Sequence, residues 1–340
     1  MRSAGAALVA LGLLGGAALA AFPAGLPSDG QELPVTRLAR LGEAAEVYFS
    51  PDGASLIGTA RRPGDEWHHV YTTTLDGQTI RRINDKGRDA CSYYFPDGKH
   101  IVWTSTRDHE ELPPGNYSDP RDYPQGAELY VSNPDGSDVR RLTNNSVYDA
   151  EVSVSPDGKW VLFTRQRDGK LDLWRVRPDG TEEFQITHTD DWQEGGSFYL
   201  PDSETILFRA WKRQDEGKKP LEMTVFTIRH DGTGLRQVTH DPGTNWAPHP
   251  APDGRHFTYV RLLPPHNFEV YLGDLQTGES RRLTWNEAFD GFPAFSPDGR
   301  TLVFASGRDG APGEHKLEVY LMDVSSLGLG PAAAARAARR

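Results

Sequence analysis

Cysteine is almost missing from this chain, because Cys91 is the only one among 340 residues. No disulfide can form within the chain, so the fold must be held together by packing alone. We expect Cys91 to be a small buried hydrophobic residue, with a nucleophilic thiol as the alternative.

Positive charge and membrane-spanning runs are scarce as well. The formal net charge is -11 at pH 7, and the basic cluster that stands out lies in the Ala-rich tail, residues 326–340, which we expect to be disordered. Nucleic acid is therefore a poor partner, since binding a polyanion requires a basic face that releases counterions. Beyond the first 20 residues, no apolar run is long enough to cross a bilayer.

The first 20 residues, MRSAGAALVALGLLGGAALA, contain one basic residue, an apolar stretch and a terminal Ala-Leu-Ala. This pattern predicts a secretory signal peptide over residues 1–20, and an uncleaved anchor helix is the alternative. Cleavage would leave residues 21–34 as a linker and no membrane span. We therefore expect a periplasmic or secreted protein.

Recognisable catalytic motifs are missing too. Neither HExxH nor GxSxG occurs in the sequence. The 11 histidines are scattered, and the chain has no room beside its repeats for a hydrolase domain. We assign no catalytic residue and no firm cofactor.

What the sequence has instead is a repeat. A Pro-Asp-Gly turn, once Pro-Asp-Ser, recurs six times at intervals of 45, 60, 45, 51 and 45 residues, with its prolines at Pro51, Pro96, Pro156, Pro201, Pro252 and Pro297. An apolar run precedes each turn and an alternating run follows it, as a β-hairpin with one buried face requires. A second hairpin follows in most repeats. Each period thus holds about four strands, the content of one propeller blade.

The outermost strand of most blades is marked by a phrase of the RRLT type, as in residues 140–143 and 281–284. The sixth repeat ends without this phrase, whereas residues 36–41 (TRLARL) resemble it and have no blade of their own. We therefore predict an all-β fold, a six-bladed β-propeller of four-stranded blades over residues 35–325. An N-terminal strand joins the last blade and closes the ring.

The phrases FSPDG, NPDGSDVRRLT and DGFPAFSPDGRTLVFAS resemble the propeller repeats of the TolB family over roughly residues 35 to 325. The resemblance implies a six-bladed propeller with a general binding role in the cell envelope. TolB carries an α/β domain ahead of its propeller. Residues 21–34 leave no room for one, so we expect the propeller without that domain.

Two sets of side chains are candidates for a channel site, because the innermost strand of each blade lines the centre of a propeller. Seven residues before each proline lie Ala44, Asp89, Asp149, Glu194, Asn245 and Asp290. Five residues before it lie Glu46, Cys91, Glu151, Gly196, Ala247 and Phe292. Since side chains alternate along a strand, we expect both sets to point into one channel.

Carboxylates dominate the first set. We expect four of them to surround one mouth and to hold a hard cation such as calcium: Asp89, Asp149, Glu194 and Asp290. Four further residues are expected to contact a ligand: Glu46, Glu151, Asn245 and His249. The alternative is a ring of solvated acids, or of acids paired with arginines that follow the second strand, such as Arg61, Arg107 and Arg165.

Three loops are longer than the repeat requires: Arg61 to His69, Arg107 to Gly126, and Lys212 to Pro220. Each follows the second strand of a blade, so all three should emerge on one rim, where recognition commonly resides. Tyr117 and Tyr123 in the proline-rich second loop could contact a partner at small entropic cost. A lid that merely covers the rim is the alternative.

These features favour an exported binding or scaffold protein, expected to be a monomer, that engages a protein or small ligand at the channel mouth and looped rim. The alternative is a metal-dependent lyase or hydrolase that uses His249 and the channel carboxylates. A third reading, in which the propeller is one part of a larger machine, stays open.

Overall fold

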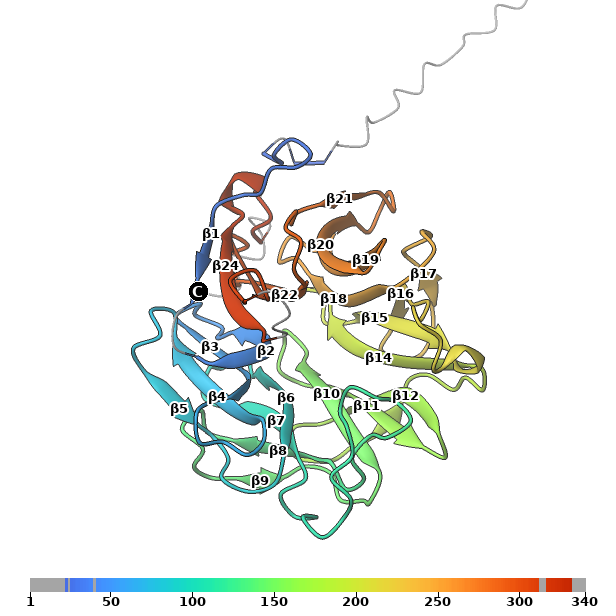
Figure 1. The fold of residues 1–340 in the computed structure, drawn as a ribbon. Helices are drawn as coiled ribbons and strands as arrows, with labels where there is room; N and C mark the ends of the chain where they lie inside the picture. Colours follow the sequence, from blue (N-terminus) through green and yellow to red (C-terminus); the bar gives the residue numbers. More distant parts are fainter. Residues whose placement is uncertain (1–21, 24, 39–40, 312–315, 332–340) are drawn as a thin grey trace, which may run out of the picture.

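The computed structural model describes residues 22–23, 25–38, 41–311 and 316–331. The described chain folds into six four-stranded antiparallel sheets arranged around a common centre, as Figure 1 shows. The predicted all-β, six-bladed propeller is therefore confirmed. The predicted signal peptide, residues 1–20, and most of the predicted tail lie outside the described residues.

Each of the first five blades is built from four consecutive strands. Blade 1 contains β2 (Glu43–Phe49), β3 (Ser55–Arg61), β4 (His69–Thr74) and β5 (Ile80–Arg82). Blade 2 contains β6 (Asp89–Tyr94), β7 (Ile101–Ser105), β8 (Glu128–Ser132) and β9 (Arg140–Arg141). Blade 3 contains β10 (Tyr148–Val154), β11 (Val161–Arg167), β12 (Lys170–Val176) and β13 (Phe184–Gln185).

Blade 4 contains β14 (Trp192–Tyr199), β15 (Thr205–Lys212), β16 (Thr224–Arg229) and β17 (Arg236–Gln237), with a short 3-10 turn, η1 (Arg213–Asp215), after β15. Blade 5 contains β18 (Asn245–Pro250), β19 (His256–Leu263), β20 (Asn267–Asp274) and β21 (Ser280–Arg282). In each of these five blades the first of the four strands is the innermost one (Figure 1).

The sixth blade joins the two ends of the described chain. It contains β22 (Asp290–Phe295), β23 (Thr301–Ser306) and β24 (Glu318–Asp323), and its outermost strand is β1 (Val35–Arg37). Val35 pairs with Met322 and Arg37 with Tyr320 in antiparallel register. An ion pair joins Arg37 to Glu318. The predicted closing strand is thus present, and it covers an edge that would otherwise be open.

The Pro-Asp-Gly turns close the inner hairpins with short-range hydrogen bonds. In blade 1 the Asp52 carboxylate accepts from the Ser50 hydroxyl at 2.6 Å and from the backbone N–H of Ala54 at 3.0 Å. Gly53 has φ +72°, a conformation that glycine adopts without steric cost. The same contact recurs in blades 3 and 6, at Ser155 with Asp157 and at Ser296 with Asp298.

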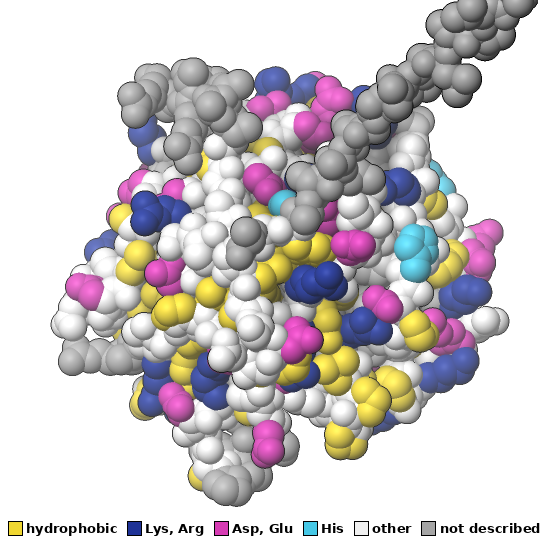
Figure 2. Space-filling model, turned by 90° about the horizontal axis from the view of Figure 1, so that it is seen from above, with side chains coloured by type: hydrophobic (Ala, Val, Ile, Leu, Met, Phe, Trp, Pro, Cys, Tyr) yellow, Lys and Arg dark blue, Asp and Glu magenta, His cyan; other side chains and the backbone are white. Residues whose placement is uncertain are grey.

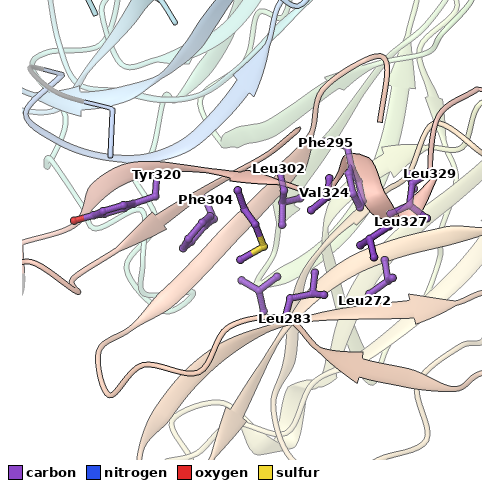
Figure 3. Packing of buried hydrophobic residues seen from close by; sticks show 12 residues of the cluster. Leu272, Leu283, Phe295, Leu302, Phe304, Tyr320, Val324, Leu327 and Leu329 are labelled. Atoms are coloured by element: carbon purple, nitrogen blue, oxygen red, sulfur yellow. The ribbon is translucent and has the colours of Figure 1, made fainter. Parts of the chain in front are cut away.

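Hydrophobic core fills the space between adjacent blades. In Figure 3, Leu302 and Phe304 of blade 6 belong to one cluster with Leu272 and Leu283, which come from blade 5 and the segment after it. Each fully buried side chain of this kind contributes roughly 1.5–3 kcal/mol to folding. Leu327 and Leu329 are buried in the same cluster. The packed chain therefore continues past residue 325 into the first residues of the predicted tail.

The face seen in Figure 2 carries basic and acidic side chains interspersed with apolar ones. Mixed charge of this kind is typical of a solvated protein surface. Within the described residues, no helix is both long enough and apolar enough to span a membrane.

Candidate ligand-binding channel

Each of the six innermost strands has a β-bulge at the same repeat position. At the bulge, the residue five before the turn proline has a left-handed backbone with φ between 27° and 56°: Glu46, Cys91, Glu151, Gly196, Ala247 and Phe292. A bulge bends the strand, re-aims a side chain and interrupts the alternation of the strand. The expectation that both predicted sets face one channel is therefore wrong, because it assumed unbroken alternation.

The first set, seven residues before the proline, is buried inside the protein. Arg165 binds both oxygens of Asp149, at 2.6 and 2.8 Å, and the Asn145 side-chain amide donates to the same carboxylate at 2.8 Å. Asp290 is held in a similar way by Arg308, at 3.0 Å, and by Asn286. These two acids are therefore paired with arginines near the end of the second strand, as the alternative in the sequence analysis predicted.

The other polar members of this set are also engaged by protein groups. Asp89 accepts from the Asn84 side-chain amide at 2.6 Å. Glu194 accepts from the Thr189 hydroxyl at 2.6 Å, and burial raises the pKa of Glu194 to about 8. The Asn245 amide donates to backbone carbonyl oxygens of nearby loops, at 2.9 and 3.1 Å. None of these side chains reaches the cavity described below.

A preformed metal centre does not emerge from these acids. Among the residues that the structure describes, no group of three or more His, Cys, Asp or Glu side chains could hold a metal ion. The four acids predicted to surround one mouth are each bound to protein partners of their own. Calcium binding at this ring stays a prediction from the sequence, without a ready-made set of oxygen ligands to support it.

The second set, in contrast, lines a cavity of about 350 Å³ at the centre of the propeller. All six members reach its wall. They are joined there by aromatic side chains from the inner strands, the loops and the second strand of blade 4: Tyr48, Tyr117, Tyr123, Phe198, Trp211 and Trp246. A concave, mostly apolar site with a few convergent polar groups is the usual form of a small-molecule site.

The long loop between β7 and β8 forms part of the outer wall, through Tyr117 and Tyr123. Tyr123 stacks on Tyr148 of β10, with ring centroids 4.1 Å apart. The Gln166 amide of β11 donates to the carbonyl of Pro120 at 2.9 Å. This loop, which belongs to blade 2, is thus fastened onto blade 3 beside the cavity mouth.

The other two predicted loops lie on the same rim. Residues Leu221 and Met223, which follow the long loop of blade 4, line the cavity beside the blade 2 loop. The loop of blade 1 meets the blade 2 loop around a separate pocket that includes Trp67 and Pro113. The prediction that the three long loops share one rim is therefore confirmed.

Two oppositely charged side chains of the wall neutralise each other. The Arg209 guanidinium, from β15, donates to Glu151 at 2.7 Å. Glu151 also accepts from the backbone N–H of Gly196 at 2.7 Å and from the Thr164 hydroxyl at 3.0 Å. Arg209 is only 6% exposed, so this ion pair acts in a medium of low dielectric constant, where it is strong and its separate charges would be costly.

Glu46 has no such partner. Its carboxylate accepts from the Cys91 thiol at 3.1 Å, and within the described residues it makes no ion pair. Burial raises the pKa of Glu46 above its ordinary value, and the nearby charge of Glu151 adds to the shift. Burial likewise raises the pKa of the Cys91 thiol well above its usual range. Cys91 is buried, as predicted, and acts here as a protonated donor.

An aromatic layer closes the inner end of the cavity. Tyr48 contacts Tyr93 and Phe198, with ring centroids 5.2 and 5.5 Å apart, and His249 stacks on Tyr48 at 6.0 Å. Tyr48 and Phe198 also line a second cavity, of about 470 Å³, which is ringed by all six turn prolines. His249 belongs to that second cavity, and burial lowers its pKa to about 3.

Of the four predicted ligand residues, the structure brings Glu46 and Glu151 together in one cavity. His249 lines the opposite end of the channel, and Asn245 is buried in a structural role. Sequence reasoning missed Arg209. A signal was available, because Arg209 stands eight residues after its turn proline, where the other repeats carry Thr59, Thr104, Thr164, Val260 and Ala305.

No family model matches the sequence. An uncharacterized protein of Agrobacterium fabrum is 26% identical over 222 residues, which are 64% of this chain and 69% of that protein. The uncharacterized peptidase YuxL of Bacillus subtilis and dipeptidyl-peptidase 5 of Porphyromonas endodontalis are both 25% identical, over 82% and 80% of this chain. The matches cover only 32% and 38% of those two peptidases, about a third of their length.

Solved structures share the architecture. The structure of putative TolB from Agrobacterium tumefaciens has a TM-score of 0.59 and 20% identity, covering 85% of this chain and 96% of that one. TolB from Acinetobacter baumannii gives 0.58 and 17%, covering 91% and 67%. Oligogalacturonate lyase in complex with manganese gives 0.57 and 16%, covering 86% and 94%. At these identities the likeness establishes a TolB-like propeller fold and no shared activity.

Proposed function

We propose that this chain is an exported binding protein that receives a small ligand, or the end of a protein segment, in the loop-covered cavity at the centre of the propeller. The observation that carries the proposal is the cavity itself. Its six inner-strand residues all have a left-handed backbone at a bulge. In the five that are not glycine this conformation costs about 1–3 kcal/mol each, and backbone strain of this kind is commonly found at functional sites.

The rim supports the same proposal. Loops held on a rigid ring are the usual place for recognition. Here the blade 2 loop is fixed by the stacking of Tyr123 on Tyr148 and by the hydrogen bond from Gln166. A wall that is ordered before a ligand arrives lowers the entropic cost of binding.

The alternative, a metal-dependent lyase or hydrolase, receives no specific support from the described side chains. His249 and the channel carboxylates were its predicted machinery. Among these carboxylates, Glu46 and Glu151 line the central cavity, whereas His249 lines the other one. The likeness to a lyase and to two peptidases concerns the fold or a third of a longer chain. We therefore favour binding over catalysis.

Export is a separate part of the proposal, and it rests on residues 1–20, which lie outside the described residues. The test is the intact mass of the protein recovered from a periplasmic extract or culture supernatant. We expect a chain that begins after Ala20. A full-length mass in the membrane fraction would favour the uncleaved anchor helix instead.

The cavity is tested by filling it. Three probes of equal size, phenethylamine, 2-phenylethanol and phenylacetate, are titrated into the mature protein and followed by calorimetry and by tryptophan fluorescence. We expect at least one of them to bind, and Met223→Trp to abolish binding because its indole occupies the cavity. The matched control is Leu235→Trp at a surface position that is 60% exposed. If no probe binds, or if both variants bind like the wild type, the proposal fails.

A further inference from the structure

The charge of the central cavity is unbalanced. Among the described residues that line it, the acidic and basic side chains are Glu46, Glu151 and Arg209. Arg209 and Glu151 neutralise each other through their ion pair. Glu46 is left with neutral donors, the thiol and the backbone N–H of Cys91. The cavity thus has one carboxylate in excess, at a position where solvent reaches it only in part.

A half-buried carboxylate without a counter-ion is costly, because the low-dielectric surroundings oppose its charged form. That cost falls when a cation approaches. The faces of aromatic rings also attract cations, since the ring quadrupole is negative above and below the plane. The wall around Glu46 contains such rings from three inner strands, including Tyr48, Trp246 and Phe292.

We propose that the cavity binds a small organic cation, an amine or quaternary ammonium on an apolar body, with its nitrogen held by Glu46 and its body held by the surrounding aromatic rings. This inference rests on the proposed function, because it names the class of ligand for the same site. It excludes anions as preferred ligands, since an anion would lie beside the excess carboxylate. A neutral molecule of the same shape should bind with lower affinity than the amine.

The experiment compares the affinities of the three probes for the mature protein at a pH where phenethylamine is protonated. We expect phenethylamine to bind about tenfold more tightly than 2-phenylethanol, as expected for one cation–carboxylate contact with aromatic support. Phenylacetate should bind most weakly. In Glu46→Gln, the affinity for phenethylamine should fall to that for 2-phenylethanol, and the affinity for 2-phenylethanol should stay the same.

The matched control is Glu43→Gln, which removes the same charge at the start of the same strand, β2, where Glu43 pairs with Arg61 near the surface. This variant should keep the preference for phenethylamine. Equal affinities for phenethylamine and 2-phenylethanol in the wild type would overturn the inference and leave the proposed function standing. An equal loss of preference in both variants would also overturn it, because the overall charge would then be responsible. Binding of no probe counts against the proposed function itself.

Discussion

The same six inner strands carry two rings of side chains, two residues apart, that have opposite fates. The ring at the start of the strands, with Asp149 and Asp290, is buried and saturated by arginine and asparagine partners. The ring at the bulge, with Glu46 and Glu151, faces the central cavity. Each residue of the second ring is itself the left-handed residue of the bulge. The comparison teaches that a short shift along a propeller strand converts a structural carboxylate into a candidate binding group.

The largest expected effect breaks the structural ring. Asp149→Ala should lower the free energy of unfolding by about 3 kcal/mol, because the buried Arg165 loses one of its two carboxylate partners and keeps Glu183. Urea unfolding measures this change. The control is Glu204→Ala, which removes the exposed ion pair with Arg229 and should cost less than about 1 kcal/mol. If both variants lost the same free energy of unfolding, the buried ion pair of the ring would be no more important for stability than an ion pair at the surface.

A smaller loss of stability is expected where the cavity ring has its own ion pair. Glu151→Gln should cost about 1–3 kcal/mol, because Arg209 keeps a hydrogen-bond acceptor and loses the charge opposite it. The same variant makes the cavity neutral overall, so the preference for phenethylamine over 2-phenylethanol should shrink. Urea unfolding and calorimetric titration measure the two effects. A variant that is destabilised and yet keeps the full preference would contradict the role assigned to the excess charge.

Glu46→Gln should leave stability nearly unchanged. Burial raises the pKa of Glu46, so the folded protein holds this proton more tightly than the unfolded chain does. The contribution of Glu46 to stability is therefore complete at low pH and is lost as pH rises through the raised pKa. Above that pKa, the variant should be more stable than the wild type, by less than about 1 kcal/mol. Urea unfolding at pH 4 and pH 8 tests the sign, and a variant that is less stable at pH 8 contradicts it.

Binding should show the opposite dependence on pH. Phenethylamine needs ionised Glu46, so its affinity should fall as pH is lowered through the raised pKa, while Glu46→Gln should show a flat profile. The charged or titratable groups that interact with Glu46 are Tyr48 from its own strand, Cys91 from β6, Glu151 from β10 and Arg209 from β15. Calorimetric titrations between pH 4 and pH 8 measure the profile. A pH profile that is the same in the variant would assign the titration to one of those other groups.

The smallest effect is expected from calcium. Each acid of the buried ring already has protein donors, so calcium or a chelator should leave the thermal midpoint unchanged. The comparison of midpoints with calcium and with chelator checks this. A midpoint that rises with calcium in the wild type, and does not in Asp149→Asn with Asp290→Asn, would establish the cation ring predicted from the sequence.

The fold was predictable because each blade repeats its signals. The Pro-Asp-Gly turns form inner hairpins through the same local hydrogen bonds in blades 1, 3 and 6. The closing strand was predictable from the RRLT-type phrase that lacked a blade. The loops were found by their length alone, and all three lie on the predicted rim.

The site was only partly predictable, because side-chain direction depends on the bulges. Nothing in the local sequence marks them, since Glu46, Cys91, Ala247 and Phe292 share the left-handed backbone and have no common chemistry. Simple alternation therefore assigned Asp149 and Glu151 to one channel. The sequence offered Arg165 as a possible partner for the acids of this ring, and the register of β10 with β11 shows that it meets Asp149.

The most direct test of the account is a crystal structure of the mature protein soaked with phenethylamine. We predict density in the loop-covered cavity, with the nitrogen facing Glu46 and the ring among Tyr48, Trp246 and Phe292. Density confined to the proline-ringed cavity beside His249, or to the outer surface, would contradict the claim that the bulge ring forms the binding site.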